Sequence, residues 1–394
     1  MLEILINKED NKKDIALLEN GRLLEYYMDE DNSKRNEGNI YVGVVKNVIK
    51  GMQAAFVDIG TEKNSFIHLK DILDKIDESK ENINPKIDIS DIIKTGQKLL
   101  VQVKKDSNLQ KGARVSTHIN LPSKYIALMP NTDIITVSQK IEDKKEQERL
   151  IKLVKENLSP ENGAIIRTSA AGKNQEIIED IKNVEKRWKE IQAKFENNKA
   201  SKPKLIAKAN GIFEKMIIDL PEKSVQKITL NSKEEYNNIM QFNKMNNYLS
   251  GTDIVLKENE DILDIYDVKK EVSKLENRKI WLKCGGFITI DKTEALTAID
   301  VNTGKYTGNK SVEDTVFKVN KEATVEIAKQ IRLRDIGGII IIDYIDMKNE
   351  KNKEEIQTLL EEKLKLDRAK TQVEGFTKLD LMELTRKHIC SHKE

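Results

Sequence analysis

The segment from Gly285 to Met347 decides the fold of this chain. It contains GGFITIDKTEALTAIDVNTGK at 285–305 and RLRDIGGIIIIDYIDM at 332–347. Alternating or continuous apolar, β-branched residues are typical of strands, and apolar residues spaced three and four apart are typical of one helix face. The segment therefore predicts, in order, strands at 287–290 and 295–301, a helix with its apolar stripe from Val312 to Ile331, and a buried strand at 339–342. A strand–helix–strand order favours parallel neighbours in one sheet.

Both of the last two strands end in a carboxylate, Asp300 in AIDVN and Asp343 in IIDYID. If the strands are parallel neighbours, the two carboxylates lie at one edge of the sheet, where open α/β sheets bind ligands. With the amide of Asn302 they make an oxygen-rich site, and Mg²⁺ needs only one or two protein carboxylates. From the pattern alone, a structural role is the more common one: Asp300 would begin the turn at Asn302–Gly304 and Asp343 would cap the next segment.

Composition narrows the class of protein. The chain has 394 residues, enough for two or more domains, with 34% charged residues and a net charge of +2, so any nucleic-acid site must be a local patch. Its two cysteines form no disulfide framework, its N-terminus has no signal-peptide pattern, and no apolar run reaches the ~18 residues of a membrane span. These features predict a soluble cytoplasmic protein.

Residues 39–119 have the pattern of a small β-barrel, with five short apolar strands and glycines between them. The stretch GMQAAFVDIGTEKNSFIHLKDI at 51–72 resembles the S1 RNA-binding domain. Such barrels stack bases on aromatic rings beside cationic side chains. Phe56 and Phe66 are the candidate rings and Lys111 the candidate phosphate contact, although a phenylalanine in a strand is more often part of a core. The charged segment 74–91 is predicted to be an insertion loop.

Other segments predict structure whose partners lie elsewhere in the chain. Three short N-terminal strands, at 2–6, 14–18 and 23–28, are too small to bury a core alone and must pair with a later segment. Residues 144–157 are predicted to be a helix. Residues 175–196 form a second one, whose apolar seam favours packing on its own domain over binding a partner.

The stretches TEALTAIDVNTGK and RLRDIGGIIIIDYIDM closely resemble the catalytic core of the ribonuclease E/G family, and the resemblance extends over nearly the whole chain. It implies a multidomain α/β and α+β fold, in which a ribonuclease-H-like subdomain is interrupted by the S1 (OB-type) barrel and a 5′-sensor region and is followed by a DNase-I-like α/β catalytic subdomain. The implied boundaries are 1–36 and 211–275 for the ribonuclease-H-like parts, 37–119 for the S1 domain, 120–210 for the sensor and 276–394 for the catalytic subdomain.

The resemblance also implies roles for particular residues. Asp300 and Asp343 look like ligands of Mg²⁺, for which Mn²⁺ could substitute, and Asn302 looks like the residue that orients one of them. Arg167 and Thr168, in NGAIIRTSAAG at 162–172, match the arginine and threonine of a 5′-monophosphate pocket. A guanidinium is a bidentate phosphate ligand, although an Arg-Thr pair after a strand is usually surface decoration.

The chain departs from the family pattern inside the expected pocket. Ser123 stands where a glycine is expected, Ala127 where a valine is usual, and Gln139 where a basic residue is usual. These changes put the shape of the pocket in doubt. Further along, Arg368 and Lys370 could contact substrate phosphates or form a solvated basic face.

The implied activity is that of a Mg²⁺-dependent endoribonuclease that cuts single-stranded RNA, in RNA processing and decay, to 5′-phosphate and 3′-hydroxyl ends. The alternative is a non-catalytic RNA-binding assembly or regulatory factor with structural carboxylates. A nucleotidyltransferase is disfavoured because the sequence has no glycine-rich phosphate loop.

The family's closely spaced zinc-binding cysteine pair is missing from this sequence. Near the end of the chain, only Cys390 and His392 could ligate a metal, at a spacing tighter than that of usual zinc ligands. Zinc is therefore not expected, and the predicted assembly is a monomer or weak homodimer.

Overall fold

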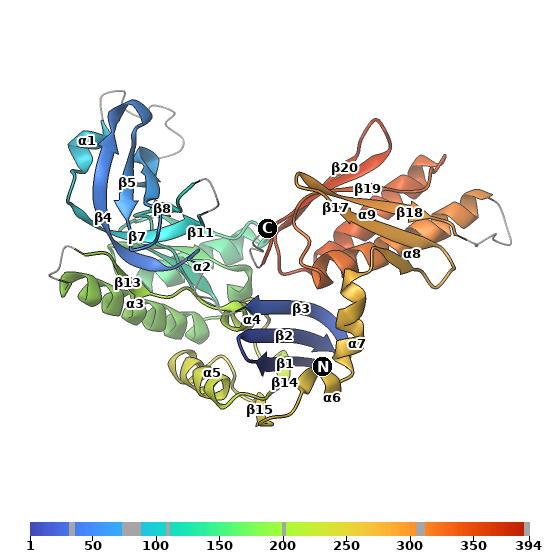
Figure 1. Cartoon of the computed structure of the whole chain (residues 1–394), viewed down its shortest axis with the longest axis horizontal. Coiled ribbons are helices and arrows are strands. Elements are labelled where there is room, and N and C mark those ends of the chain that lie inside the picture. The colour runs from blue at the N-terminus through green and yellow to red at the C-terminus, as the bar shows by residue number, and fades with distance from the viewer. Residues whose placement is uncertain (31–35, 73–87, 108–110, 199–201, 305–311, 390–394) are drawn as a thin grey trace. The chain divides into compact units, whose positions relative to one another are not determined.

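The computed structural model describes residues 1–30, 36–72, 88–107, 111–198, 202–304 and 312–389 (Figure 1). The chain divides into two compact units. The first comprises residues 1–31, 222–241 and 248–394, and the second residues 32–221 and 242–247. None of the helices in the described part of the chain has the length and apolar character needed to span a bilayer.

One sheet of the first unit joins the N-terminal strands to a segment more than 200 residues later. Its strand order is β15-β14-β1-β2-β3, with bounds β1 Leu2–Glu9, β2 Lys12–Glu19, β3 Arg22–Glu30, β14 Val225–Leu230 and β15 Asp253–Leu256. Strand β1 pairs in parallel with β14, which gives hydrogen-bond partners to the edge of β1 that does not face β2. The prediction that the N-terminal strands need a later partner is confirmed. The short helices α6 Ile262–Ile265, α7 Val268–Val272 and η4 Ser273–Glu276 belong to this unit, whereas the longer helix α5, Lys233–Asn246, begins in this unit and ends in the second.

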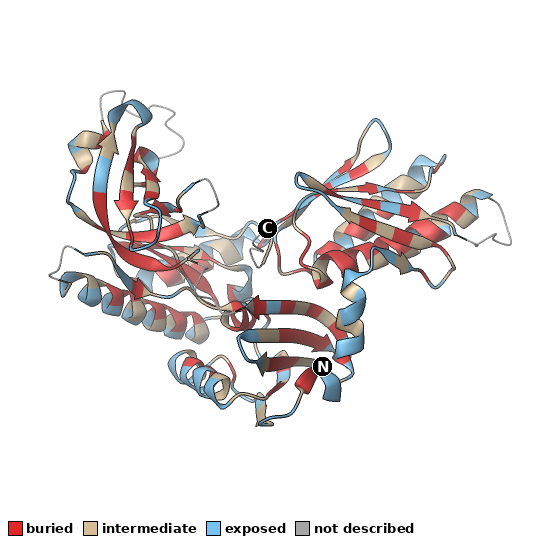
Figure 2. Cartoon of the chain, viewed as in Figure 1, coloured by how far each residue is buried: buried red, intermediate tan, exposed pale blue. Residues whose placement is uncertain are grey.

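The second sheet of this unit, called here the C-terminal sheet, has the order β16-β17-β18-β19-β21-β20. Its bounds are β16 Lys279–Trp281, β17 Phe287–Lys292, β18 Leu296–Asn302, β19 Gly338–Asp343, β20 Thr371–Phe376 and β21 Leu381–Arg386. Strands β18 and β19 are parallel neighbours, as predicted, and are connected through helix α8, Val312–Leu333. The inward residues of the strands form one core with α8 and with α9, Glu350–Leu364 (Figure 2). The opposite face is left to solvent and is called here the solvent face.

In the second unit, a closed barrel confirms the predicted S1-type architecture. Strands β4, β5, β6, β8 and β7 follow one another, β4 also pairs with β7, and β13 adds to β4. The bounds are β4 Ile40–Ile49, β5 Ala54–Asp58, β6 Ser65–His68, β7 Lys98–Lys105, β8 Arg114–Ser116 and β13 Lys204–Ala207, with η1 Lys50–Met52, η2 Leu69–Asp71 and α1 Ile89–Ile92 between them. Most of the predicted insertion loop at 74–91 lies outside the described residues, and its last residues begin α1.

A four-stranded sheet, β11-β12-β10-β9, stands beside the barrel in the same unit. Its bounds are β9 Leu121–Pro122, β10 Ile126–Pro130, β11 Ile135–Val137 and β12 Asn162–Ile166, with helices α2 Lys144–Asn157, η3 Thr168–Ala170, α3 Gln175–Glu196 and α4 Ile212–Asp219. The apolar seam of α3, including the buried Trp188, packs into the core shared with β10, β12 and α2. The predicted seam therefore packs on its own unit.

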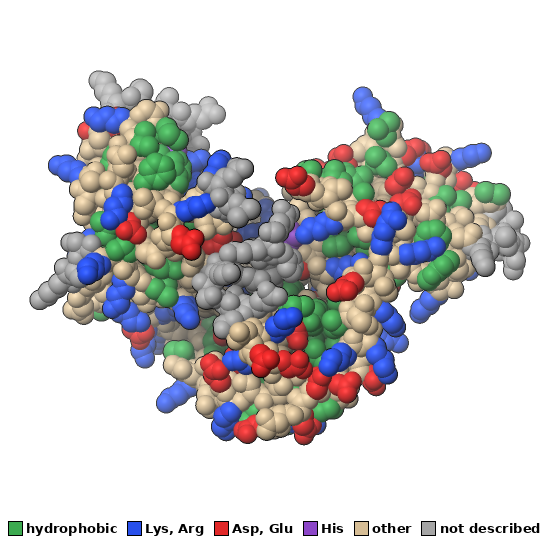
Figure 3. Space-filling model, viewed as in Figure 1, with side chains coloured by type: hydrophobic (Ala, Val, Ile, Leu, Met, Phe, Trp, Pro, Cys, Tyr) green, Lys and Arg blue, Asp and Glu red, His purple; other side chains and the backbone are tan. Residues whose placement is uncertain are grey.

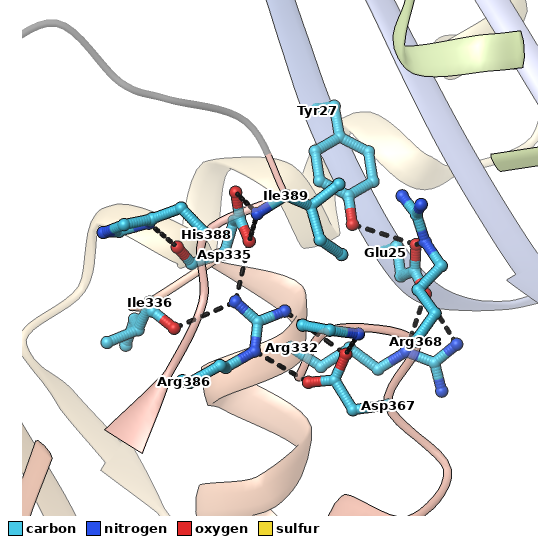
Figure 4. Close-up of polar contacts among 11 residues, drawn as sticks. Glu25, Tyr27, Arg332, Asp335, Ile336, Asp367, Arg368, Arg386, His388 and Ile389 are labelled. Carbon is cyan, nitrogen blue, oxygen red and sulfur yellow. Dashed lines mark hydrogen bonds and ion pairs between the residues drawn. The ribbon is translucent and has the colours of Figure 1, made fainter. Parts of the chain in front are cut away.

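Two buried charge clusters hold elements of the first unit together (Figure 4). On β3, the fully buried carboxylate of Glu25 accepts hydrogen bonds from Nε of Arg332 and Nε of Arg368, both at 2.8 Å, and from the Tyr27 hydroxyl at 2.9 Å. Burial acts to raise the pKa of Glu25, but the adjacent guanidinium groups of Arg368 and Arg332 outweigh it and hold this pKa below its ordinary value.

The second cluster is centred on the buried guanidinium of Arg386 in β21. It donates to Asp335 and Asp367, each at 2.7 Å, and to the carbonyl of Ile336 at 2.9 Å.

The prediction that Arg368 lies on an RNA-facing or solvated surface is wrong. Its side chain is only 6% exposed, because it is paired with Glu25. Lys370, two residues later, is exposed. Outside such clusters, the face shown in Figure 3 mixes basic and acidic side chains rather than presenting one basic field.

Candidate functional site

The two candidate catalytic carboxylates are direct cross-strand partners. Asp300 at the end of β18 and Asp343 at the end of β19 are paired in the parallel register. Their strand neighbours Ile299, Val301 and Ile342 point into the core, so by the two-residue alternation of a strand both carboxylates lie on the solvent face. Both residues are exposed. The predicted convergence at one edge of the sheet is confirmed, while their role as metal ligands stays a prediction.

Two polar neighbours act on this pair. The side-chain amide of Asn302 donates a hydrogen bond to Asp300 Oδ2 at 2.5 Å, which fixes the orientation of that carboxylate. The pKa of Asp343 is raised by partial burial and then by the negative charges of Asp300 and Asp346. The guanidinium of Arg278 is close enough for Asp300 to help raise its pKa, after the larger effect of Asp291.

The donor set fits a hard divalent cation. No group of three or more His, Cys, Asp or Glu side chains with metal-binding geometry is found among the described residues. Two neighbouring carboxylates, with the pKa of Asp343 raised in part by the charge of Asp300, are nevertheless the type of site that Mg²⁺ completes with water and phosphate oxygens. Asp300 and Asp343 would hold the ion, and Asn302 would keep Asp300 in place.

On the barrel, Phe56 and Phe66 are register partners on neighbouring strands, and their rings meet edge to face with centroids 6.2 Å apart. Both are half-buried, whereas the residues on either side of each in the strand are more buried or point to the interior. Their rings are thus neither core residues nor fully solvated. Lys111 is exposed and lies two residues before Ala113. The carbonyl of Ala113 accepts a hydrogen bond from the backbone amide of Phe66 at 2.7 Å, which places this segment next to the strand of Phe66. The structure brings all three candidate RNA contacts to one region of the barrel.

Arg167 follows β12, but its guanidinium is already engaged. It donates to the carbonyl of Ser123 at 2.8 Å and forms an ion pair with Asp219, at the end of α4, at 2.5 Å. Sequence reasoning missed Asp219, because it is 52 residues away and only the fold places it against Arg167. Any 5′-phosphate would have to compete with this carboxylate.

The departures from the expected pocket have structural explanations. Ser123 is buried and its hydroxyl donates to Asp180 Oδ1 at 2.6 Å, while Oδ2 of the same carboxylate accepts from the amide of Tyr125 at 2.9 Å. Ala127 is buried within β10, so neither substitution adds a side chain to the surface. Thr168 is paired through its hydroxyl with Ser138 at 2.8 Å. Gln139 is exposed.

The structure describes one of the chain's two cysteines. Cys284 is a free thiol beside the C-terminal sheet, and its amide donates to Glu322. Cys390 and His392 lie outside the described residues. The expectation of a zinc-free monomer or weak homodimer therefore stays a prediction.

Comparison with known proteins adds independent information. The sequence model of the Ribonuclease E/G family matches residues 120–389, and that of the S1 RNA binding domain matches residues 34–117. Over 397 residues the chain is 38% identical to Ribonuclease G of Salmonella typhimurium, an alignment that covers 98% of this chain and 79% of that protein. It is 37% identical over 396 residues to Ribonuclease G of Escherichia coli (strain K12), with the same coverage. Ribonuclease E of Nostoc sp. is 34% identical over 358 residues, covering 89% of this chain and 51% of that protein.

Proposed function

The chain belongs to the ribonuclease E/G family and is an endoribonuclease of RNA processing, and from this premise we propose that it cuts single-stranded RNA with Mg²⁺ held by Asp300 and Asp343. The observation that carries the proposal is the pairing of these two carboxylates on the solvent face, with Asn302 bonded to Asp300. The proposed fold has a ribonuclease-H-like subdomain around the N-terminal strands and a DNase-I-like subdomain around the C-terminal sheet.

The proposed reaction is hydrolysis of one phosphodiester bond. The oxygen of a water molecule bonds to phosphorus, the bond from phosphorus to the 3′-oxygen breaks, and that oxygen takes a proton, leaving 5′-phosphate and 3′-hydroxyl ends. When bound, Mg²⁺ would supply Lewis-acid chemistry, acidifying a water and offsetting negative charge at phosphorus. Asp300 and Asp343 provide the two fixed negative charges for it, and the Asn302 amide limits the rotation of Asp300.

The test is a cleavage assay with a single-stranded RNA labelled at either end. Internal cuts are expected only when Mg²⁺ or Mn²⁺ is present, and the downstream product should be a substrate for a 5′-monophosphate-dependent exonuclease. Products with 2′,3′-cyclic phosphate ends, or equal cutting in EDTA, would contradict the proposed chemistry.

For the barrel we expect Phe66→Ala to weaken binding of single-stranded RNA by ~1–3 kcal/mol, the usual contribution of one stacked base. The half-buried ring contacts Phe56, so the variant should still fold. Binding is measured by fluorescence anisotropy and folding by circular dichroism. Phe66→Trp, which keeps a flat ring, is the matched control and should retain affinity. Loss of the barrel fold without a selective loss of affinity would assign Phe66 to the core.

For the sensor we expect opposite effects at Arg167 and Asp219. Arg167→Ala removes the cation and should reduce the preference for 5′-monophosphorylated over 5′-hydroxyl RNA by roughly 10- to 100-fold, the scale of losing charged hydrogen bonds. Asp219→Asn removes the competing carboxylate of the ion pair and should increase the same preference. The measurement is the ratio of kcat/KM for the two substrates. A wild-type ratio of one that Asp219→Asn leaves unchanged would mean that no functional pocket exists at Arg167.

A further inference from the structure

An exposed cluster of two aromatic rings and one lysine lies on β16 and β17. Trp281 is 59% exposed, and its ring meets that of Phe287 with centroids 5.3 Å apart at 63°. The ammonium nitrogen of Lys279 lies over both rings, 4.2 Å from the Trp281 centroid and 3.4 Å from that of Phe287. These three residues are called here the aromatic–lysine cluster.

The strand register places this cluster beside the candidate catalytic residues. Trp281 pairs with Phe287 across β16 and β17, and Phe287 pairs with Asn302 across β17 and β18. Because neighbouring strands are about 4.8 Å apart, the Trp281 backbone lies roughly 10 Å from that of Asn302.

A parallel row of partners confirms the shared face. Lys279 pairs with Thr289, Thr289 with Asp300, and Asp300 with Asp343. Residues two apart in a strand point to the same side. The cluster and both carboxylates therefore belong to one continuous solvent face of the C-terminal sheet.

Core packing does not account for Trp281. The opposite face of this sheet is already closed by α8 and α9, and the core formed there includes Ile288 and Ile290 of β17 but not Trp281. A large, mostly exposed indole beside a cation has the composition of a single-strand binding surface, where bases stack on rings and cations contact the backbone.

We propose that the aromatic–lysine cluster is a base-stacking subsite for single-stranded RNA, holding a nucleotide next to the phosphate cleaved at Asp300 and Asp343. Trp281 provides the ring on which the base stacks, and Phe287 packs against that ring. Because the ammonium group of Lys279 lies beside both rings, it can contact the phosphate of a nucleotide that is stacked there. The occupant is RNA because the cluster shares one face with Asp300 and Asp343, and the charged member of the cluster, Lys279, is a cation that suits a phosphate backbone. This inference rests on the proposed cleavage of RNA.

The chain allows a direct optical test, because it has two tryptophans and the other one, Trp188, is 4% exposed in the core around α3. Trp188→Phe leaves Trp281 as the sole indole. Its fluorescence is titrated with single-stranded oligoadenylate on an Asp343→Asn background, so that the RNA is not cut. Quenching is expected with oligoadenylate and not with an abasic oligonucleotide of the same length.

The same contact should appear in affinity. Trp281→Ala is expected to weaken oligoadenylate binding about 5- to 150-fold, equivalent to 1–3 kcal/mol for one stacked base, and Trp281→Phe should restore most of it. Ile339→Ala is the matched control, because Ile339 is 50% exposed on the same face of β19 but at the end far from Asp343. The Ile339→Ala variant should bind oligoadenylate with the same affinity as the chain without this substitution.

The outcomes separate this inference from the proposed function. If the wild-type chain neither binds nor cuts RNA, the proposed function fails and the subsite fails with it. If it cuts RNA while Trp281 fluorescence is unchanged by oligoadenylate, or Trp281→Ala binds like Ile339→Ala, the subsite alone is refuted. Quenching by the abasic probe would also refute stacking.

Discussion

Asp300→Asn and Asp343→Asn are each expected to lower RNA turnover by at least ~10²-fold at saturating Mg²⁺, the scale of removing one preorganised electrostatic group from an active site. Each change removes one negative charge from the carboxylate pair and keeps the size of the side chain. RNA affinity should change little, because neither substitution alters the candidate RNA contacts on the barrel or the aromatic–lysine cluster. Single-turnover cleavage gives the rate, and anisotropy gives the affinity.

A matched carboxylate on the same sheet tests whether this effect is specific. Asp291 on β17 also faces solvent, where it forms an ion pair with Arg278, and surface pairs contribute little to stability. Asp291→Asn should therefore cut at close to the wild-type rate. Wild-type turnover in Asp300→Asn or Asp343→Asn, or an equal loss in Asp291→Asn, would exclude the paired carboxylates as the catalytic metal site.

Glu25→Ala is expected to lower the free energy of unfolding of the first unit by about 3–5 kcal/mol, the usual cost of removing one partner from a buried ion pair. The change leaves the guanidinium groups of Arg332 and Arg368 buried beside an empty space, and it also removes the acceptor of the Tyr27 hydroxyl. Urea unfolding followed by circular dichroism measures the effect, with the midpoint and slope analysed separately.

Two controls test whether the expected loss of stability depends on the burial of the Glu25 ion pairs. Glu234→Ala breaks an exposed ion pair with Lys8 in the same unit and should leave stability nearly unchanged. A triple variant, Glu25→Leu with Arg332→Met and Arg368→Met, replaces the charges by apolar groups and should be more stable than Glu25→Ala. A Glu25→Ala protein as stable as the wild type would show that the cluster adds nothing to the fold.

The cluster also predicts a dependence on pH. Because the folded-state pKa of Glu25 is held below its ordinary value of 4.5, the stability it contributes is present above pH 4.5 and is lost as the pH falls through the folded-state pKa. Below pH 4.5 the wild type should therefore lose stability more steeply than the triple variant. If the unfolding free energies of the wild type and the triple variant fall equally with pH in that range, the pKa of Glu25 is not lowered in the folded state.

The sequence by itself determined several local elements and the side-by-side placement of Asp300 and Asp343. Helices at 144–157 and 175–196 were predicted with the bounds of α2 and α3, because a long apolar stripe at helical spacing has few other ways to be buried. The order strand, helix, strand around Asp300 and Asp343 was enough to bring the two carboxylates together, because parallel strands end at the same edge of their sheet.

Only the tertiary structure decided which distant residues touch. The ion pairs between Asp219 and Arg167, and between Glu25 and both Arg332 and Arg368, join residues that are 52 to 343 positions apart in the sequence. Sequence reasoning therefore placed Arg368 on a surface when it is buried. The exposure of Trp281 on the same face as Asp300 and Asp343 was equally invisible, because a single aromatic residue in a short edge strand has the same pattern whether it faces the core or the solvent. Periodicity records which face of an element is apolar, whereas partners and exposure follow from how the elements pack.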